Sequence, residues 1–302
     1  MLALIAGMGD LPPALVVRLG TPPLVCAMRG FEPSLPVDIS FRLEHLGSFL
    51  AKLKKRGVTR ICMAGAVRRP PVDPAEIDAA TAPLVPRIQA ALTQGDDGAL
   101  RVFIGIMEEM GIKVVPAHDV APDLLPRTGV LTKAGPASSH TADAFAGEEC
   151  VRQMGLADSG QACVIRDGAV VVREDSHGTD AMLKKLALPY APSQSTISGD
   201  PYFFPVEVAV VLAKEVRSWL ADHPKPNPQA EGGILFKAPK PDQDRRADLP
   251  LIGPRTAMLA AEAGLDGIVI EAGGVMVLDL STVRRILDAQ GMFLWVRPRG
   301  GA

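Results

Sequence analysis

The sequence lacks a hydrophobic run long enough to cross a membrane. No stretch of its 302 residues approaches the roughly 20 consecutive apolar residues that a spanning helix requires. The N-terminus begins apolar, but Gly7, Gly9 and Asp10 interrupt it and no basic residue precedes them. We therefore expect a strand and a turn there rather than a signal peptide. These absences predict a cytoplasmic protein that meets any lipidic substrate from the water side.

The chain also has little net charge, no closely spaced pair of cysteines and few aromatic residues. A formal charge of −2 offers no electrostatic footprint for nucleic acid, so we expect no nucleic-acid partner and a locally built site for any anionic substrate. Aromatic residues make up only 4%, and the 47% hydrophobic fraction rests on Ala, Leu and Val, as in an ordered globular chain. The cysteines lack CxxC spacing and lie in or beside apolar runs, which is typical of reduced, buried thiols: Cys26, Cys62, Cys150 and Cys163.

What is present is the pattern of two α/β domains, because 302 residues exceed what one core usually organises. In the first part, short apolar runs alternate with helical patterns, which indicates βα units and a mainly parallel sheet. Strands are expected at 3–5, 24–28, 60–64 and 113–115, and helices over about 43–56 and 99–110. The sequence predicts a Rossmann-like N-terminal domain over residues 1–130.

A second α/β domain containing hairpins is predicted over residues 131–302. The stretch 116–140 is rich in Pro, Gly and Ser and marks the connection. Asp167-Gly168 lies between two apolar runs and favours a tight hairpin turn. Further elements are expected as helices at 179–186, 254–263 and 282–290, strands at 234–237 and 293–296, and a strand pair around Gly273-Gly274.

An insertion at about 190–231 differs from its surroundings. A Ser- and Pro-rich lead is followed by an amphipathic segment that runs to Trp219 and whose apolar positions share one helical face. This pattern favours a helix packed on the second domain. The alternatives are a lid, a contact in a homodimer, and a helix lying on the surface of the inner membrane, although only Lys214 and Arg217 in this segment would face anionic headgroups.

Small residues after the first strand form a candidate phosphate site. Gly7-Met8-Gly9 lies where backbone amides can approach a phosphate, and the alternative is a plain strand-to-helix turn. Pro12 occupies the position of the third glycine in the dinucleotide fingerprint, so no nicotinamide cofactor is expected.

Two arginines follow the strand at 60–64, at the end of a parallel strand where open α/β sheets bind ligands. Arg68 or Arg69 can clamp a diphosphate through paired hydrogen bonds, and the alternative is that both are ordinary surface residues.

Acidic residues precede two of the predicted helices. Asp96 and Asp97 either cap a helix or provide hard oxygen ligands to a divalent metal. In Gly178-Thr179-Asp180, Thr179 or Asp180 can cap the following helix, while the amides at its start can receive a phosphate.

The most charged loop runs over residues 236–253 and carries Lys237 and Lys240 together with arginines and carboxylates. A solvated charge run is the usual explanation for such density. Asp248, however, lies beside the apolar residues 249–252, which indicates a positioned carboxylate.

Six segments in one order resemble the LpxI family across nearly the whole chain: LIAGMGDLP, AGAVRRP, GDDGALR, GTDAML, KAPKPDQDRRADLPLIG and GIVIEAG. The resemblance implies an N-terminal Rossmann-like domain and a distinct C-terminal α/β domain with a lipid-linked sugar nucleotide held between them. It also implies hydrolysis of UDP-2,3-diacylglucosamine to 2,3-diacylglucosamine 1-phosphate and UMP in lipid A biosynthesis, with a divalent cation, Mg²⁺ or Mn²⁺.

Within this resemblance the family's catalytic aspartate falls on Asp248, which would ligate the metal or orient the attacking water. Candidate metal ligands beside it are Asp96, Asp97 and Asp180. Candidates for substrate binding are Gly7, Gly9, Arg68, Arg69, Gly178, Thr179, Lys237 and Lys240. Two other functions remain open, a nucleotide-sugar glycosyltransferase, which would release UDP, and a non-catalytic regulator that binds a sugar nucleotide.

Overall fold

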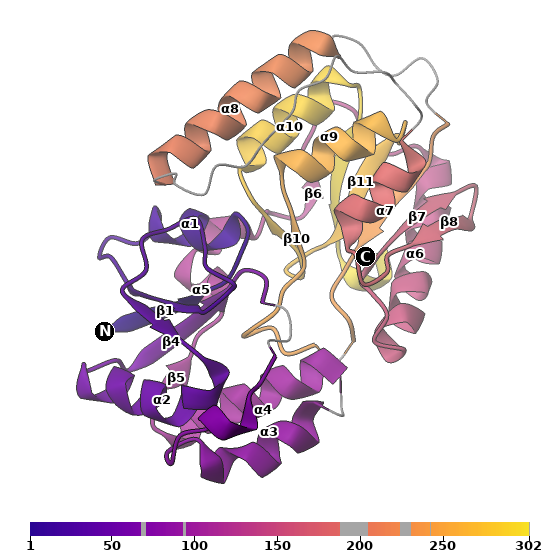
Figure 1. Ribbon diagram of the computed structural model, residues 1–302. Coiled ribbons are helices and arrows are strands. Elements are labelled where there is room, and N and C mark those ends of the chain that lie inside the picture. The colour runs from indigo at the N-terminus through magenta and orange to yellow at the C-terminus, as the bar shows by residue number, and fades with distance from the viewer. Residues whose placement is uncertain (68–70, 93–94, 188–204, 224–230, 242, 302) are drawn as a thin grey trace. The chain divides into compact units, whose positions relative to one another are not determined.

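The computed structural model describes residues 1–67, 71–92, 95–187, 205–223, 231–241 and 243–301 (Figure 1). The chain forms two compact units. The first contains Met1–Pro122, residues 205–208 and Asp244–Asp248, and the second contains most of the remaining chain from Asp123 onward. A short segment from late in the sequence therefore belongs to the N-terminal unit, and each unit is described by itself below.

The first unit is built on a five-stranded sheet with the order β3-β2-β1-β4-β5, in which every neighbouring pair is parallel. This confirms the predicted parallel sheet. Its strands are β1 (Leu2–Ala6), β2 (Leu24–Met28), β3 (Ile39–Phe41), β4 (Arg60–Ala64) and β5 (Lys113–Val114).

Helices cover this sheet because their apolar residues recur at three- and four-residue steps. In α2 (Leu46–Lys55), Phe49, Leu50 and Leu53 are buried, and Gly57 follows the helix with a φ of +76°. The other helical elements are α1 (Leu11–Val16), α3 (Val85–Leu92), α4 (Gly95–Glu109), α5 (Ala117–Val120), and the short 3₁₀ turns η1 (Leu43–His45), η2 (Pro74–Glu76) and η3 (Ala82–Leu84).

The second unit has a six-stranded mixed sheet with the order β6-β13-β11-β9-β7-β8. Its three central strands are parallel to one another, and β6, β7 and β8 each run antiparallel to the neighbour they join. The strands are β6 (Gly129–Val130), β7 (Ala162–Arg166), β8 (Ala169–Arg173), β9 (Ile234–Lys237), β11 (Gly267–Glu271) and β13 (Phe293–Arg297). Asp167 and Gly168 join β7 to β8 with φ angles of 50° and 75°, which confirms the predicted hairpin.

The helices of the second unit are α6 (Ser138–Leu156), α7 (Thr179–Leu186), α8 (Pro205–Asp222), α9 (Pro254–Glu262) and α10 (Leu280–Ala289), with short turns η4 (Pro122–Leu124) and η5 (Arg299–Gly301). No helix in the described ranges is long and apolar enough to span a membrane. In the last turns of α8, Val216 is buried in the core of this unit and the Trp219 indole donates to Glu262 at 2.7 Å. This confirms a packed helix there, whereas 188–204 and 224–230 of the predicted insertion lie outside the described residues.

The strand pair expected around Gly273-Gly274 is not formed. Gly273 has a φ of +65° and Gly274 donates back to the Glu271 carbonyl, so the chain turns out of the main sheet. The following strand β12 (Met276–Val277) pairs in parallel with β10 (Leu251–Ile252) and forms a separate small sheet. The two strands beside the glycines therefore belong to different sheets.

Candidate functional site

The turns after β1 and β4 are joined through their backbones at the carboxyl edge of the first sheet. Gly7 donates to the Ala64 carbonyl at 2.8 Å, and Met8 and Ala66 exchange two hydrogen bonds at 3.0 and 2.8 Å. A Cβ on Gly7 would lie 2.5 Å from the Ala66 oxygen, and one on Gly65, with a φ of +88°, would lie 2.7 Å from the Gly7 oxygen. Close approach of the two turns thus explains why Gly7 and Gly65 are glycines.

Gly9 differs from Gly7, because its φ is +99° and its missing Cβ faces open space. Its turn conformation explains the glycine, and the space beside it is what a phosphate near these amides would need. Arg68 and Arg69, the predicted diphosphate clamp on the neighbouring turn, lie outside the described residues.

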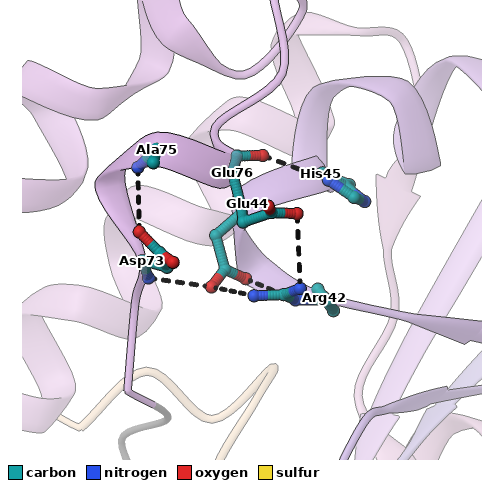
Figure 2. Close-up of polar contacts among 6 residues, drawn as sticks. All are labelled: Arg42, Glu44, His45, Asp73, Ala75 and Glu76. Atoms are coloured by element: carbon teal, nitrogen blue, oxygen red, sulfur yellow. Dashed lines mark hydrogen bonds and ion pairs between the residues drawn. The ribbon is translucent and has the colours of Figure 1, made fainter.

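The chain around Asp73 is anchored by Glu44, whose side chain is 4% exposed (Figure 2). Arg42 Nη2 donates to Glu44 Oε1 at 2.9 Å, and the Asp73 amide donates to the same oxygen at 3.0 Å. The bond from Arg42, followed by the bond from the Asp73 amide, lowers the pKa of Glu44 to about 2. Arg42 also lies 3.6 Å from Glu76, and His45 Nε2 lies 3.1 Å from the Glu76 carbonyl.

A second anchor lies a few residues further on. The Gly47 amide donates to Thr81 Oγ1 at 2.8 Å, and the Thr81 amide donates to Asp78 Oδ1 at 2.7 Å. A Cβ on Gly47 would collide with the backbone of Ala80, so these segments touch directly. Residues 64–66 are therefore held by the backbone bridge to the β1 turn, and residues 73–81 by Glu44 and Thr81.

Asp248, the predicted catalytic residue, is exposed and lies in the first unit. The segment Asp244–Asp248 is held there by Arg246, which pairs with Asp244 at 2.7 Å and with Glu108 of α4 at 2.8 Å, and by Ala247, which packs against the apolar core of this unit. The Arg246 guanidinium holds the pKa of Asp244 below its usual value. These contacts fix the backbone that carries Asp248.

The described residues do not supply a preformed metal site. They contain no group of three or more His, Cys, Asp or Glu side chains placed to hold an ion. Asp180, in the second unit, is engaged by Arg255 Nε at 3.1 Å and by Thr256 Oγ1 at 3.5 Å. Asp96 and Asp97 lie in the first turn of α4, but their side chains lie outside the described part of the chain. The predicted set of four metal ligands therefore stays a prediction.

Two predicted substrate-binding residues meet in the second unit. Lys237, at the end of β9 and 5% exposed, donates from Nζ to Thr179 Oγ1 at 2.6 Å. Thr179 in turn donates to Glu174 Oε1 at 2.5 Å, and the Gln161 amide donates to the other oxygen of Glu174 at 2.8 Å. Glu174 was missed by sequence reasoning, because nothing in its spacing shows that it accepts from Thr179.

The start of α7 carries no side-chain cap. Gly178, with a φ of +87°, occupies the N-cap position, and neither Thr179 nor Asp180 caps the helix as the alternative interpretation required. Thr179 is instead committed to Glu174 and Lys237, and Asp180 to Arg255. Lys240, a few residues along the chain from Lys237, pairs with Asp158 at 2.5 Å.

Two more buried charges at the same edge of this sheet were not predicted. Glu271 ends β11 and pairs with Arg299 at 2.9 Å, while Arg297 ends β13 and pairs with Glu148 at 2.6 Å. The sequence did carry a signal for these two residues, because each is a charged residue at the end of an otherwise apolar strand. The cysteines are buried and free as expected, and burial raises the pKa of Cys26 and of Cys62 to about 12.

Comparisons with known proteins match both halves of the chain. Residues 1–124 match the LpxI N-terminal domain family, and residues 127–295 match the LpxI C-terminal domain family. The chain is also 33% identical over 301 residues to the UDP-2,3-diacylglucosamine pyrophosphatase LpxI of Caulobacter vibrioides, an alignment that covers 97% of this chain and 96% of that protein.

Proposed function

The chain belongs to the LpxI family, and from that premise we propose that it hydrolyses UDP-2,3-diacylglucosamine to 2,3-diacylglucosamine 1-phosphate and UMP, as a step of lipid A biosynthesis. One observation carries the proposal. The alignment with a protein named for this activity extends over 97% of the chain and includes both domains in the same order. A fold alone would not support an activity, whereas a shared arrangement over the full length does.

Water attacks the α-phosphorus, the new oxygen enters UMP, and the bridging oxygen leaves with the sugar phosphate. Asp248 is the residue that we place at this step, because it is exposed on a segment that Arg246 and Ala247 hold in place. A carboxylate fixed in this way can orient the attacking water without a further rearrangement of the protein. The turn at Gly9 is proposed to bring backbone amides to a phosphate.

Lys237 and Thr179 are proposed as contacts of the second unit to the substrate. The Lys237 ammonium already donates to Thr179, and Thr179 donates to Glu174, so all three side chains are held in one geometry. A cation fixed in a buried place interacts with phosphate oxygens more strongly than one on a flexible surface side chain.

The proposed mechanism includes a divalent cation, and removing that cation from the enzyme tests this part of the proposal. Magnesium takes only one or two protein carboxylates and completes its shell with water and phosphate, so Asp248 with the diphosphate is a chemically sufficient anchor. We expect EDTA to abolish hydrolysis and Mg²⁺ or Mn²⁺ to restore it. Full activity in chelator would remove the cation from the mechanism.

The substrate's acyl chains lead us to propose a protein that acts on the cytoplasmic face of the inner membrane, in peripheral contact with it. Co-sedimentation with vesicles that contain the diacylated sugar nucleotide, compared with vesicles without it, measures that contact. Sedimentation equilibrium of the same preparation tests the homodimer that the insertion at about 190–231 offers as an alternative.

The decisive experiment is turnover of the diacylated sugar nucleotide in ¹⁸O-water, with the products read by mass spectrometry. We expect one ¹⁸O in UMP and none in the sugar phosphate. Label in the sugar phosphate would place the attack on the other phosphorus. Release of UDP would indicate a glycosyltransferase, and tight binding without turnover in the presence of metal would indicate a regulator.

A further inference from the structure

A histidine lies near the carboxyl edge of the first sheet. His118 is the second residue of α5, the short helix that follows β5 and packs against β4. Open α/β sheets bind their ligands at the carboxyl ends of parallel strands. The helix thus brings an imidazole to the edge where the glycine turns of β1 and β4 also lie.

One nitrogen of this imidazole is unsatisfied. The side chain is 22% exposed, and its Nδ1 is buried without a hydrogen-bond partner among the residues that the structure describes. The other nitrogen, Nε2, lies 3.9 Å from Asp119 Oδ1. Buried polar atoms are nearly always paired, so an orphan one calls for a partner such as a ligand or a water.

Charges around the ring favour its neutral form. Burial lowers the pKa of His118 below its usual value, Arg245 lowers it further, and Asp119 opposes both. β4, which packs against α5, carries its only charge, Arg60, at its opposite end. A histidine in such surroundings is uncharged near neutral pH and has one nitrogen able to accept a proton.

The direction of the free nitrogen follows from Asp119. A carboxylate on the Nε2 side favours the tautomer in which Nε2 carries the hydrogen, which leaves the lone pair on Nδ1. Arg245, whose charge acts on the ring, belongs to the segment Asp244–Asp248, which lies in the same unit and ends with the predicted catalytic aspartate. The charge of Arg245 therefore acts on the imidazole from the segment that carries Asp248.

We propose that Nδ1 of His118 accepts the proton of the water that attacks the substrate's phosphorus, an inference that rests on the proposed function. The water oxygen forms a bond to the α-phosphorus, and the bond from that phosphorus to the bridging oxygen breaks with its electron pair leaving on the sugar phosphate. The water's proton passes to Nδ1, and the imidazolium then releases it to solvent. Asp248 orients the same water, so the two residues act on one atom from a single unit.

The test compares His118→Asn and His118→Ala with wild type in the UMP-release assay, with melting curves on the same preparations. We expect kcat to fall by about 10²-fold or more while KM changes little, because a general base acts on the chemical step. Added imidazole should raise the rate of His118→Ala, which a merely structural histidine would not allow. His223→Asn is the matched control, since the Nδ1 of this histidine contacts the Trp219 carbonyl in the second unit, and it should retain full turnover.

The dependence of kcat on pH provides a second test, and this test does not require a His118 variant to fold. The neutral ring is the active form, so kcat should fall as pH decreases through the pKa of His118. Asp119→Asn removes the charge that raises that pKa, and the acid limb should move to lower pH. A limb that stays in place overturns the proposal, as do a kcat within threefold of wild type in His118→Asn and a rise in KM alone. Wild type that releases no UMP would instead refute the proposed function.

Discussion

The carboxyl edges of the two sheets are built by opposite means. In the first unit the edge is made from backbone, because Gly7 and Gly65 let two turns touch, and it leaves open space at Gly9. In the second unit the three central strands end in buried charges, which are Lys237, Glu271 and Arg297. Each of these charges has a polar or charged partner of its own within the unit.

This difference indicates that the first unit offers an anionic substrate backbone amides that can still donate hydrogen bonds. Amides at a turn are donors without a counter-charge, so a phosphate can bind them at little cost in desolvation of ions. A buried cation that already has partners has fewer hydrogen-bond donors left for a substrate, so it contributes mainly to the stability of the fold. We therefore expect substitutions at Asp248 and Gly9 in the first unit to act mainly on catalysis or substrate binding, and substitutions among the buried charges of the second unit to act mainly on folding.

The largest expected effect is that of Asp248→Ala. The side chain is exposed, so its removal should leave the melting curve unchanged while turnover falls by roughly 10²-fold or more. Substrate affinity should survive, and loss of a negative charge near a diphosphate can increase it. The measurement pairs kcat with substrate affinity and thermal melting on one preparation.

Asp167→Asn is the control for that variant, because it removes an exposed carboxylate from the β7–β8 turn and asparagine tolerates the positive φ there. It should keep wild-type turnover. Near wild-type kcat in Asp248→Ala would exclude this residue from catalysis, and activity lost only through unfolding would make its role structural.

The next largest effect is expected from Lys237→Met. It removes the donor to Thr179 from the hydrogen-bonded series that ends at the buried Glu174 carboxylate, and loss of such a buried partner costs about 1 to 3 kcal/mol of unfolding free energy. The double variant Lys237→Met/Glu174→Gln removes both charges and should recover much of that loss. Urea denaturation of the three proteins measures the coupling.

The same variants decide whether Lys237 also binds substrate. If it does, the double variant regains stability but keeps an elevated KM. Recovery of both stability and KM would confine Lys237 to a structural role and would remove it from the substrate-binding residues.

Sequence reasoning located most elements but missed the longest helix. The β9 strand was predicted to the residue and the β7–β8 hairpin from two residues, because their patterns are strong and local. α6 does bury one face with helical spacing, but that face carries few large apolar side chains, because small and polar residues share it with Val151 and Met154: Asp143, Ala144, Gly147 and Cys150. The Phe236 ring fills the space at Gly147, so the large apolar side chain of this contact comes from strand β9 and not from the helix.

For the site, residue types were predictable and their partners were not. Lys237 and Thr179 were both candidates, yet their contact joins residues 58 positions apart, and Glu174 enters only through it. The placement of Asp244–Asp248 in the first unit likewise has no local signature, because it depends on Glu108 and on the apolar core of that unit. Long-range pairing of polar groups is set by tertiary packing, which composition and periodicity do not report.

A smaller effect separates the two glycines of the first turn. Gly7→Ala forces a methyl group to within 2.5 Å of the Ala66 oxygen and should cost about 1 to 3 kcal/mol of unfolding free energy through overpacking. Gly9→Ala meets open space, so its cost comes only from the positive φ, and we expect a rise in KM to exceed its effect on melting. Melting curves and KM values for both variants measure the contrast.

Gly105→Ala in α4 is the control for these two variants, because the added methyl group has no atom closer than 3.8 Å and alanine is favoured in a helix. It should leave KM unchanged and should not lower stability. A Gly9→Ala protein with normal KM would argue that the amides of this turn do not receive the phosphate.

The smallest expected effect is that of Glu44→Gln, which weakens the anchor of the chain after β4. The neutral amide loses the charge-assisted bond from Arg42, and we expect the unfolding free energy at pH 7 to fall by about 1 to 2 kcal/mol. Because folding lowers the pKa of Glu44 from 4.5 to about 2, its contribution is present above pH 4.5 and is lost as pH falls toward 2. The gap between wild type and variant, measured by urea denaturation, should therefore close across that window.

Glu109→Gln provides the matched comparison, because Glu109 also pairs with an arginine, Arg87, but both side chains are exposed. Solvent screens such a pair, so we expect no measurable change in stability. A Glu44→Gln protein that behaves like Glu109→Gln would show that the bonds to Asp73 and Arg42 do not hold this segment. A gap that stays constant between pH 4.5 and pH 2 would show that the lost stability does not come from the ionised carboxylate.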